Sequence, residues 1–141
     1  MPALAMHRFQ IETKDRDQMV EITRHVAEVV ETHRLQQGIA TVFIPHTTAG
    51  ATINENADPD VVHDVLRQLD TMVPWSQPFY RHGEGNSASH VKAIMTGSSV
   101  AIPVEKSRLQ LGRWQGVWFC EFDGPRTREV WVTLNGQTQP D

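Results

Sequence analysis

The chain has a single cysteine, Cys120, among its 141 residues. One thiol cannot form an intrachain disulfide, and it cannot complete a zinc ribbon or a dithiol redox pair. Long apolar runs are also missing, because no segment approaches the ~18 apolar residues of a membrane span. The first ten residues reach charge and polarity too early for a secretory leader. We therefore expect a cytoplasmic protein with no membrane partner.

Positive charge is scarce as well. The chain has 13 Lys and Arg against 17 Asp and Glu, a formal net charge of −4. A protein that binds a phosphate backbone shows a basic stripe, and here the basic residues are scattered, so we expect no nucleic-acid partner. The length fits one domain that buries roughly two-thirds of the surface exposed by its unfolded chain. We expect a single domain over residues 1–141, since no linker, repeat or low-complexity segment interrupts the sequence.

The apolar periodicity predicts an α+β fold with mainly antiparallel sheet and about three helices. Helices are expected at 15–35, 58–73 and 86–97, with Asp15, Asp58 and Asn86 as their N-caps. Strands are expected at 7–13, 38–46, 98–106, 113–123 and 127–134. Short connections between the last three strands favour antiparallel neighbours. The stretch 45–60 is expected to be a polar loop, and 74–86 an irregular one that is rich in proline and glycine.

The strand expected at 113–123 is apolar on both faces. Trp114, Trp118 and Cys120 alternate with Val117 and Phe119. Such a strand needs a second layer or another subunit over it, and in a chain this small we favour another subunit. The alternative is that helices cover one face and the remaining strands the other. On the favoured interpretation, Trp118 or Trp131 lies in or against a subunit contact.

Three of the seven histidines stand out. His46 ends a predicted buried strand, His82 lies in a glycine-rich loop, and His90 opens a predicted helix. Such positions can converge at one end of a sheet, where open sites are usually built, and three imidazoles are a common zinc ligand set. The alternative is an exposed turn with ordinary surface histidines. Ordinary roles are favoured for the other four, which are His7, His25, His33 and His63.

Two further stretches carry polar groups that suit ligand binding. Residues 45–60 gather several side chains that suit polar recognition or a hard cation, or that merely precede the next helix: Thr47, Thr48, Asn54, Glu55 and Asn56. Residues 97–99 offer backbone N–H groups and hydroxyls that could hold a phosphate: Gly97, Ser98 and Ser99. Alone, neither pattern selects a ligand.

The segments "HTTAGATINENADPDV", "YRHGEGNSASHVKAIMTGSSVAIPV" and "LGRWQGVWFCEFDGPRTREV" resemble the YjbQ-like family in this order. The resemblance covers most of the chain. It implies a compact α+β subunit in a homotrimer, with a histidine-lined pocket at or near the subunit boundary. Members of the family have been assigned a thiamine phosphate synthase side activity. The family's motif residues correspond to His46, His82, Glu84 and His90.

One position departs from the family pattern. Relatives commonly have Gly-Thr-Trp-Gln where this chain has Arg113 between Gly112 and Trp114. The arginine could contact an anion bound nearby, or it could be an edge residue that faces solvent.

Together these observations lead to a hypothesis and an alternative. The hypothesis is a trimeric enzyme that acts on a small phosphorylated substrate, as thiamine phosphate synthesis would require. His46, His82 and His90 would hold a divalent metal, most simply zinc, or magnesium with a diphosphate substrate. Glu84 and Glu55 are the candidate acid and base. The alternative is a module that binds a metal or a phosphorylated metabolite without catalysis.

Overall fold

The computed structural model describes residues 5–140. The elements follow one another as β1 (Ala5–Glu12), β2 (Gln18–Glu21), α1 (Thr23–Thr32), β3 (Leu35–Phe43), β4 (Ala49–Glu55), α2 (Pro59–Met72), α3 (Ser87–Thr96), β5 (Ser99–Glu105), β6 (Arg108–Leu109), β7 (Gln115–Glu121) and β8 (Thr127–Thr138). Within residues 5–140, no helix has the length and the apolar composition needed to cross a membrane.

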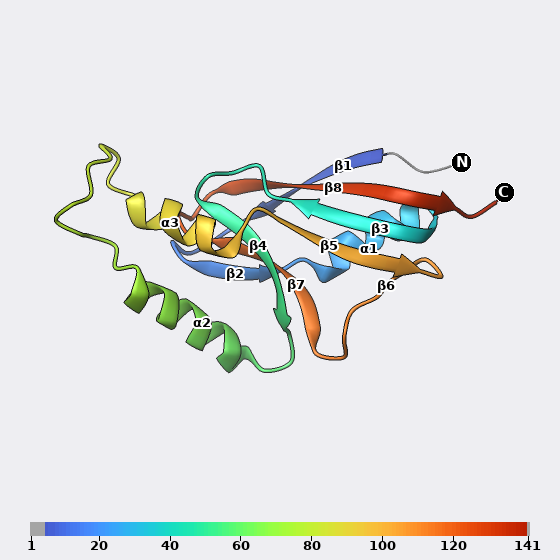
Figure 1. Ribbon diagram of the computed structural model, residues 1–141, viewed down its shortest axis with the longest axis horizontal. Helices are drawn as coiled ribbons and strands as arrows, with labels where there is room; N and C mark the ends of the chain where they lie inside the picture. The colour runs from blue at the N-terminus through green and yellow to red at the C-terminus, as the bar shows by residue number, and fades with distance from the viewer. Residues whose placement is uncertain (1–4, 141) are drawn as a thin grey trace.

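The strands form two sheets, and all their pairings are antiparallel. One sheet has the order β1-β8-β3-β5-β6, and the other has the order β2-β7-β4. Figure 1 shows α2 along one flank of the molecule, on the opposite side from α1, with α3 beside β4. This arrangement confirms the predicted α+β class with mainly antiparallel sheets and three helices.

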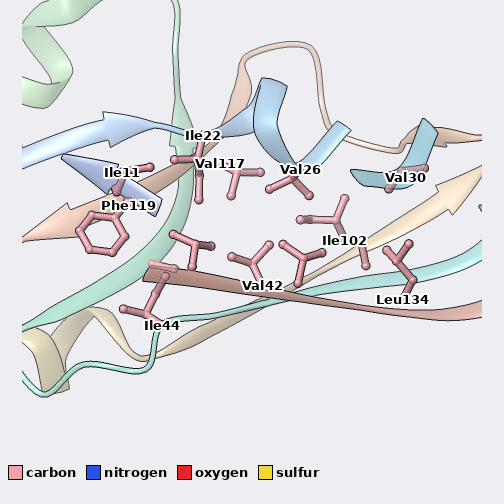
Figure 2. Packing of buried hydrophobic residues seen from close by; sticks show 14 of the residues in the cluster. Ile11, Ile22, Val26, Val30, Val42, Ile44, Ile102, Val117, Phe119 and Leu134 are labelled. Atoms are coloured by element: carbon pink, nitrogen blue, oxygen red, sulfur yellow. The ribbon is translucent and has the colours of Figure 1, made fainter. Parts of the chain in front are cut away.

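The main core lies where α1 packs against the inner faces of both sheets. Val26 and Val30 of α1 are fully buried, and they meet the apolar inner residues of β3, β5, β7 and β8 (Figure 2). The strands contribute Val42, Ile102, Val117, Phe119 and Leu134. This cluster contains most of the buried apolar side chains of residues 5–140, and its burial supplies the main driving force for folding.

A second, smaller cluster covers the other face of β7. Trp118, Cys120 and Phe122 pack there with Ala93 of α3, and side chains of β2 and α2 complete the cover. Both faces of β7 are therefore covered within one chain. The expectation that another subunit covers this strand is wrong, because the helices and the neighbouring strands are sufficient. Trp118 is buried, and its Nε1 donates a hydrogen bond to the Asn54 carbonyl at 3.2 Å.

The helix predicted at 15–35 is correct only in its second half. Residues 18–21 form β2 instead, in which Met19 pairs with Cys120 and Val20 with Phe119. The spacing of the apolar residues in this stretch fits a helix as well as a strand. The stretch forms a strand because it pairs with β7. The helix then begins at Thr23, and the N-cap position is held by Ile22, whose side chain makes no cap bond. The predicted cap at Asp15 is therefore wrong, because the helix does not start there.

The stretch predicted to be a polar loop at 45–60 contains β4. This strand pairs with β7 along its whole length, and its small residues Ala49 and Ala51 are buried. Gly50 lies directly against Thr96 and Gly97, where any Cβ would collide with them. The small residues of β4 do not show the bulky apolar pattern that predicts a strand. They do allow the end of α3 to approach the sheet closely.

The last three strands are not neighbours as predicted. β8 lies between β1 and β3, whereas β7 belongs to the other sheet between β2 and β4. The connection from β6 to β7 leads from the five-stranded sheet to the three-stranded one, and the connection from β7 to β8 leads back. The turn between β7 and β8 thereby lies beside the segment that follows β3, and this places Arg128 against Thr48.

Candidate functional site

A polar cavity of about 460 Å³ lies where the end of β7, the start of α3 and the segment after β3 meet. Its lining comes from three separate parts of the chain: Pro45, His46, Thr47, Thr48, His82, Glu84, Asn86, His90, Asp123, Arg126 and Arg128. An adjoining cavity of about 380 Å³ shares His46, Thr47 and His90 with it. The structure thus brings the three predicted histidines and Glu84 to one place. We call the 460 Å³ cavity the polar pocket.

His46 is held by the neighbouring strand. Its Nε2 accepts a hydrogen bond from the Glu129 backbone N–H at 2.9 Å. Because Nε2 is the acceptor, the neutral ring carries its proton on Nδ1. Burial lowers the pKa of His46 and the nearby Arg128 lowers it further, and together they outweigh the negative charges of Glu121 and Glu129, which raise it. His46 is therefore a neutral imidazole near pH 7, with a donor at Nδ1.

His82 and His90 approach each other from the loop and from α3. Their ring centroids are 5.4 Å apart and the rings are nearly perpendicular, at 85°. His90 lies in the first turn of α3 and is half-buried, whereas His82 is exposed. The loop histidine therefore forms the rim of the polar pocket, and the helix histidine forms part of its wall.

A buried ion pair supports the base of the polar pocket. Arg128 Nε lies 2.9 Å from Glu121 Oε1, and Nη2 contacts Glu121 Oε2 as well. Nη2 also donates to Thr48 Oγ1 at 2.8 Å. Burial raises the pKa of the Glu121 carboxyl, but hydrogen bonds from Arg128, from the Asp123 N–H and from Thr13 outweigh it, so that this pKa lies below its usual value. Arg128 is thus neutralised inside the protein, and it fixes the Thr48 backbone.

Asn86 has a buried acceptor atom without a partner. Only 7% of the residue is exposed, and its Nδ2 donates to Asp123 Oδ2 at 2.8 Å. A carboxylate only accepts hydrogen bonds, which fixes the orientation of the amide. The remaining Oδ1 is buried and makes no hydrogen bond within residues 5–140. Asn86 does occupy the N-cap position of α3, as predicted, but its side chain binds Asp123 and makes no cap bond to the helix backbone.

The three histidines do not form the predicted metal site. No group of three or more His, Cys, Asp and Glu side chains in residues 5–140 is arranged so that it could hold a metal ion. One reason is visible at His46, where the Glu129 N–H already uses the Nε2 lone pair. The residues therefore do not fit a zinc centre, which takes four ligands at about 2 Å.

The other acid–base candidate lies elsewhere. Glu55 ends β4, the strand whose first residue, Ala49, follows the pocket segment. Six steps along a strand correspond to roughly 20 Å. Asn54 and Asn56 lie at the same far end, where Asn54 Oδ1 accepts the Glu55 N–H and Asn56 Nδ2 donates to Glu21. The structure does not bring these residues together with the histidines.

The predicted phosphate-binding turn is divided between several roles. Gly97 and Ser98 line the adjoining cavity with Thr47, as expected for a place near the site. However, the Gly97 N–H donates to the Ala93 carbonyl at 2.9 Å and so closes α3. Ser99 begins β5 and is exposed. Fewer free N–H groups are available here than the sequence indicated.

Arg113 is remote from the histidines. It precedes β7, whereas the polar pocket adjoins the other end of that strand. Its guanidinium lies over the exposed ring of Trp114, 4.8 Å from the centroid. Of the two interpretations left open by the sequence, this position favours the edge residue.

Sequence reasoning missed four polar residues of the pocket. Asn86 was considered only as a helix cap, and Asp123, Arg126 and Arg128 were not considered as site residues. Arg128 had a recognisable signal, because it falls in the same alternating set as Val130 and Val132, which face the core. A charged residue in an inward set needs a buried partner. Nothing in the sequence identified Glu121 as that partner.

The comparisons with known proteins agree on one family. The UPF0047 protein YjbQ-like family matches residues 7–137. The UPF0047 protein YugU of Bacillus subtilis is 50% identical over 127 residues, which are 90% of this chain and 96% of YugU. A UPF0047 protein of Archaeoglobus fulgidus is 39% identical and covers 86% of this chain, with 94% of its own length matched.

Solved structures extend the likeness to the fold. An uncharacterised conserved protein of the YjbQ/UPF0047 family from Clostridium acetobutylicum has a TM-score of 0.89 at 48% identity, over 91% of this chain and 98% of that one. A YbjQ-like protein of unknown function from Sulfolobus solfataricus has a TM-score of 0.92 at 26% identity, over 97% of this chain and 100% of that one.

Fold and site together define a class of small α+β proteins with a histidine-rich polar pocket beside two antiparallel sheets. Within that class, the chain belongs to the UPF0047 YjbQ-like family, as the match over residues 7–137 shows. The resemblance noted from the three sequence segments is confirmed.

The function predicted from the sequence needs correction. The relatives named above are UPF0047 proteins, uncharacterised or of unknown function, and none of these names gives a thiamine phosphate synthase activity. The described residues also lack the metal cluster that the predicted reaction required. The metal-dependent enzyme for a phosphorylated substrate is therefore abandoned, together with its alternative as a metal- or phosphometabolite-binding module.

Proposed function

We propose that the protein binds a small polar molecule carrying a hydrogen-bond donor, such as an amide, an amine or a hydroxyl group, in the polar pocket. The observation that carries this proposal is the buried Oδ1 of Asn86, which has no hydrogen-bond partner within residues 5–140 and belongs to a residue that lines the polar pocket. Buried acceptors are nearly always satisfied, because leaving one unpaired costs about 1–3 kcal/mol. A ligand that donates to Oδ1 recovers this free energy on binding.

The charges around the polar pocket favour a ligand that is neutral or weakly cationic. Arg128 is neutralised by Glu121, and Arg126 Nη2 lies 3.2 Å from Asp123 Oδ2. The carboxylate of Glu84 is left among histidines, of which His46 is neutral near pH 7. An anion would find no free guanidinium in this lining, whereas an uncharged donor pays little for its desolvation.

His46 adds a hydrogen-bond donor to the acceptor that Asn86 provides. Its Nδ1–H is a donor, and Thr47 beside it supplies a hydroxyl. A ligand that accepts from His46 and donates to Asn86 uses both walls. Primary amides have this pair of groups on one carbon, so we infer that amide-like molecules fit best.

Matched probe pairs test the proposal. Benzamide is compared with methyl benzoate, and benzyl alcohol with ethylbenzene, by NMR shifts of backbone amides at 45–48 and 82–90 with a chelator present throughout. The donor-bearing member of each pair should bind about tenfold more tightly, which corresponds to about 1.4 kcal/mol. Equal affinities within both pairs would overturn the proposal.

Two variants place the binding in the polar pocket. Asn86→Ala should remove the preference within each pair, and the matched control Ser87→Ala, one residue further along, should retain it. Asn86→Ala also loses the bond to Asp123 and could destabilise the fold. The exposed rim residue His82 therefore provides the second variant, since His82→Ala leaves the buried bonds intact and should still weaken both donor-bearing probes.

A second candidate function is acid–base catalysis on the same ligand. It is favoured by the neutral imidazole of His46 and by the carboxylate of Glu84, which line one cavity, since side chains of these two kinds serve as general acids and bases. Glu84→Gln should then abolish turnover while affinity is kept. If no bound molecule is turned over by the wild type, the protein is a binding protein only.

We also propose a homotrimer, which would bury the outer face of the five-stranded sheet. Among the described residues, Ile39 is 48% and Phe43 41% exposed on that face, and the Phe43 ring lies 5.8 Å from that of Trp131. A contiguous apolar patch of this kind marks an interface. Light scattering should give three chain masses, and Phe43→Glu should reduce the mass to that of one chain.

The remaining expectations stay predictions. A cytoplasmic location is supported by the single thiol of the chain. The zinc or magnesium cofactor and the phosphorylated partner expected from the sequence are not part of the function proposed here. Metal analysis of the purified protein and a phosphate titration test them directly.

A further inference from the structure

Helix α2 covers its sheet incompletely. Val62, Val65, Leu66 and Leu69 form one apolar stripe, yet none of the fourteen residues of α2 is buried. The stripe faces β2 and the outer side of β7, where Met19 and Cys120 lie. A helix with an apolar stripe normally buries part of it completely. Space must therefore remain between α2 and the sheet.

That space is a cavity of about 210 Å³, which we call the α2 cavity. Helix α2 supplies Val65, Leu66 and Leu69, the sheet supplies Met19 and Cys120, and α3 supplies Met95. Burial raises the pKa of the Cys120 thiol to about 12, so it is present as an uncharged, unreactive group. The wall is therefore mainly apolar, and the two methionines can adapt to an occupant.

The α2 cavity is distinct from the polar pocket. The two cavities have no lining residue in common. On α3 they are reached from opposite ends, because His90 belongs to the polar pocket and Met95 to the α2 cavity. Five residues of helix separate these positions by about 7.5 Å along the axis.

We propose that the α2 cavity binds a small apolar molecule of one or two rings. The size supports this, because an engineered apolar cavity of about 150 Å³ binds benzene and stays free of water. The chemistry of the wall supports it too, since few polar groups are available to hold water: Thr52, Asn54 and Thr96. Without a ligand, the side chains that line the cavity lack van der Waals partners on one side. An apolar ligand supplies these partners.

An ion pair holds α2 over the cavity and defines how a ligand enters. Lys92 of α3 is 1% exposed, and its Nζ lies 2.6 Å from Asp17 Oδ2 and 3.1 Å from Asp70 Oδ1 of α2. The Asp70 side chain is half exposed, so water can replace this contact at modest cost. Movement of α2 away from β7 would open the cavity and expose Cys120.

Cys120 gives a direct test, because it is the only thiol of the chain. Indole is titrated while the rate of thiol reaction with 5,5′-dithiobis(2-nitrobenzoate) is followed on the full chain. Saturating indole should slow the reaction at least fivefold, since it stabilises the closed form by mass action. Calorimetry gives the dissociation constant of indole independently.

Cavity-filling variants decide where indole binds. Leu66→Trp should remove indole binding and slow thiol labelling by itself, and Val65→Phe provides a smaller filling should Leu66→Trp not fold. The control Asp64→Ala changes a side chain that is 79% exposed on α2 and should bind indole as the wild type does. The proposal is overturned if indole neither slows labelling nor releases heat, or if filled variants bind it unchanged.

Discussion

Helices α1 and α2 carry similar apolar stripes but pack very differently. In α1, ten residues long, Val26 and Val30 are fully buried between the two sheets. In α2, fourteen residues long, no side chain is buried. The stripe of a helix therefore indicates which face turns inward, while the surface it meets decides how completely that face is covered.

The difference divides the molecule into a tightly packed part and a loosely packed one. The α1 side contains the main core, and the α2 and α3 side contains the polar pocket and the α2 cavity. Regions with few buried apolar contacts open at lower free energy than the core, and ligand sites are drawn from them. We therefore expect mutations on the two sides to affect different measurements.

The largest expected effect is in the main core. Phe119→Ala removes a fully buried ring between α1 and the sheets and should lower the free energy of unfolding by about 3–5 kcal/mol. Leu69→Ala, its counterpart under α2, should cost about 1 kcal/mol or less, since that side chain is half-exposed. Urea unfolding measures both. Equal losses would remove the distinction between the two sides.

The next effect is at the buried ion pair below the polar pocket. Arg128→Met leaves the Glu121 carboxylate buried without its cation and should cost about 3 kcal/mol. The double variant Arg128→Met with Glu121→Gln should recover part of this loss, because the uncompensated charge is removed. An additive double variant would mean that the pair contributes packing only.

A smaller global effect is expected at Lys92. Lys92→Met removes the bonds to Asp17 and Asp70, but water can reach the two carboxylates that remain. The free energy of unfolding should therefore fall by only about 1 kcal/mol. Amide exchange in α2 should nevertheless become faster, because the helix loses its anchor. Unchanged exchange in α2 would show that Lys92 does not hold it.

The smallest effect is a pH dependence at the edge of the main core. Burial, and then the stacked His33 at 3.5 Å between ring centroids, lower the pKa of His7 below 6.5. The folded protein then binds fewer protons than the unfolded chain, so stability present above pH 6.5 is lost as the pH falls through that value.

His7→Phe should reduce the loss of stability between pH 7.5 and 5.5, as measured by urea unfolding at both values. It should not abolish the loss, since the pKa of His46 is also lowered, with the same sign. The pKa of Glu121 is lowered as well, but Glu121 changes the stability only below its ordinary pKa of 4.5, which lies outside this pH range. An unchanged slope in the variant would exclude His7 as a contributor.

The sequence predicted best the elements whose signals are local. Asp58 accepts the Asp60 N–H at 2.9 Å and Pro59 opens α2, as the cap pattern indicated. α3 likewise ends at Gly97, whose φ of +87° suits glycine. Elements decided by distant pairing were missed, such as β2, whose apolar residues also fit a helix, and β4, whose small residues fit a loop.

The candidate site was predictable in its histidines but not in its support. His46, His82 and His90 could be named because each follows or opens an element near one sheet end. Whether their nitrogens were free to bind a metal depended on the Glu129 N–H, which lies 83 residues from His46. Sequence separation carries no information about such a contact, and the metal site was therefore overestimated.

The central claim is that the polar pocket recognises a donor group through Asn86. A high-resolution crystal structure with benzamide tests it most directly. The account predicts that the benzamide nitrogen lies within about 2.7–3.2 Å of Asn86 Oδ1, while its carbonyl faces His46 Nδ1. Benzamide bound elsewhere, or an ordered water retained on Oδ1 at saturating benzamide, would contradict it.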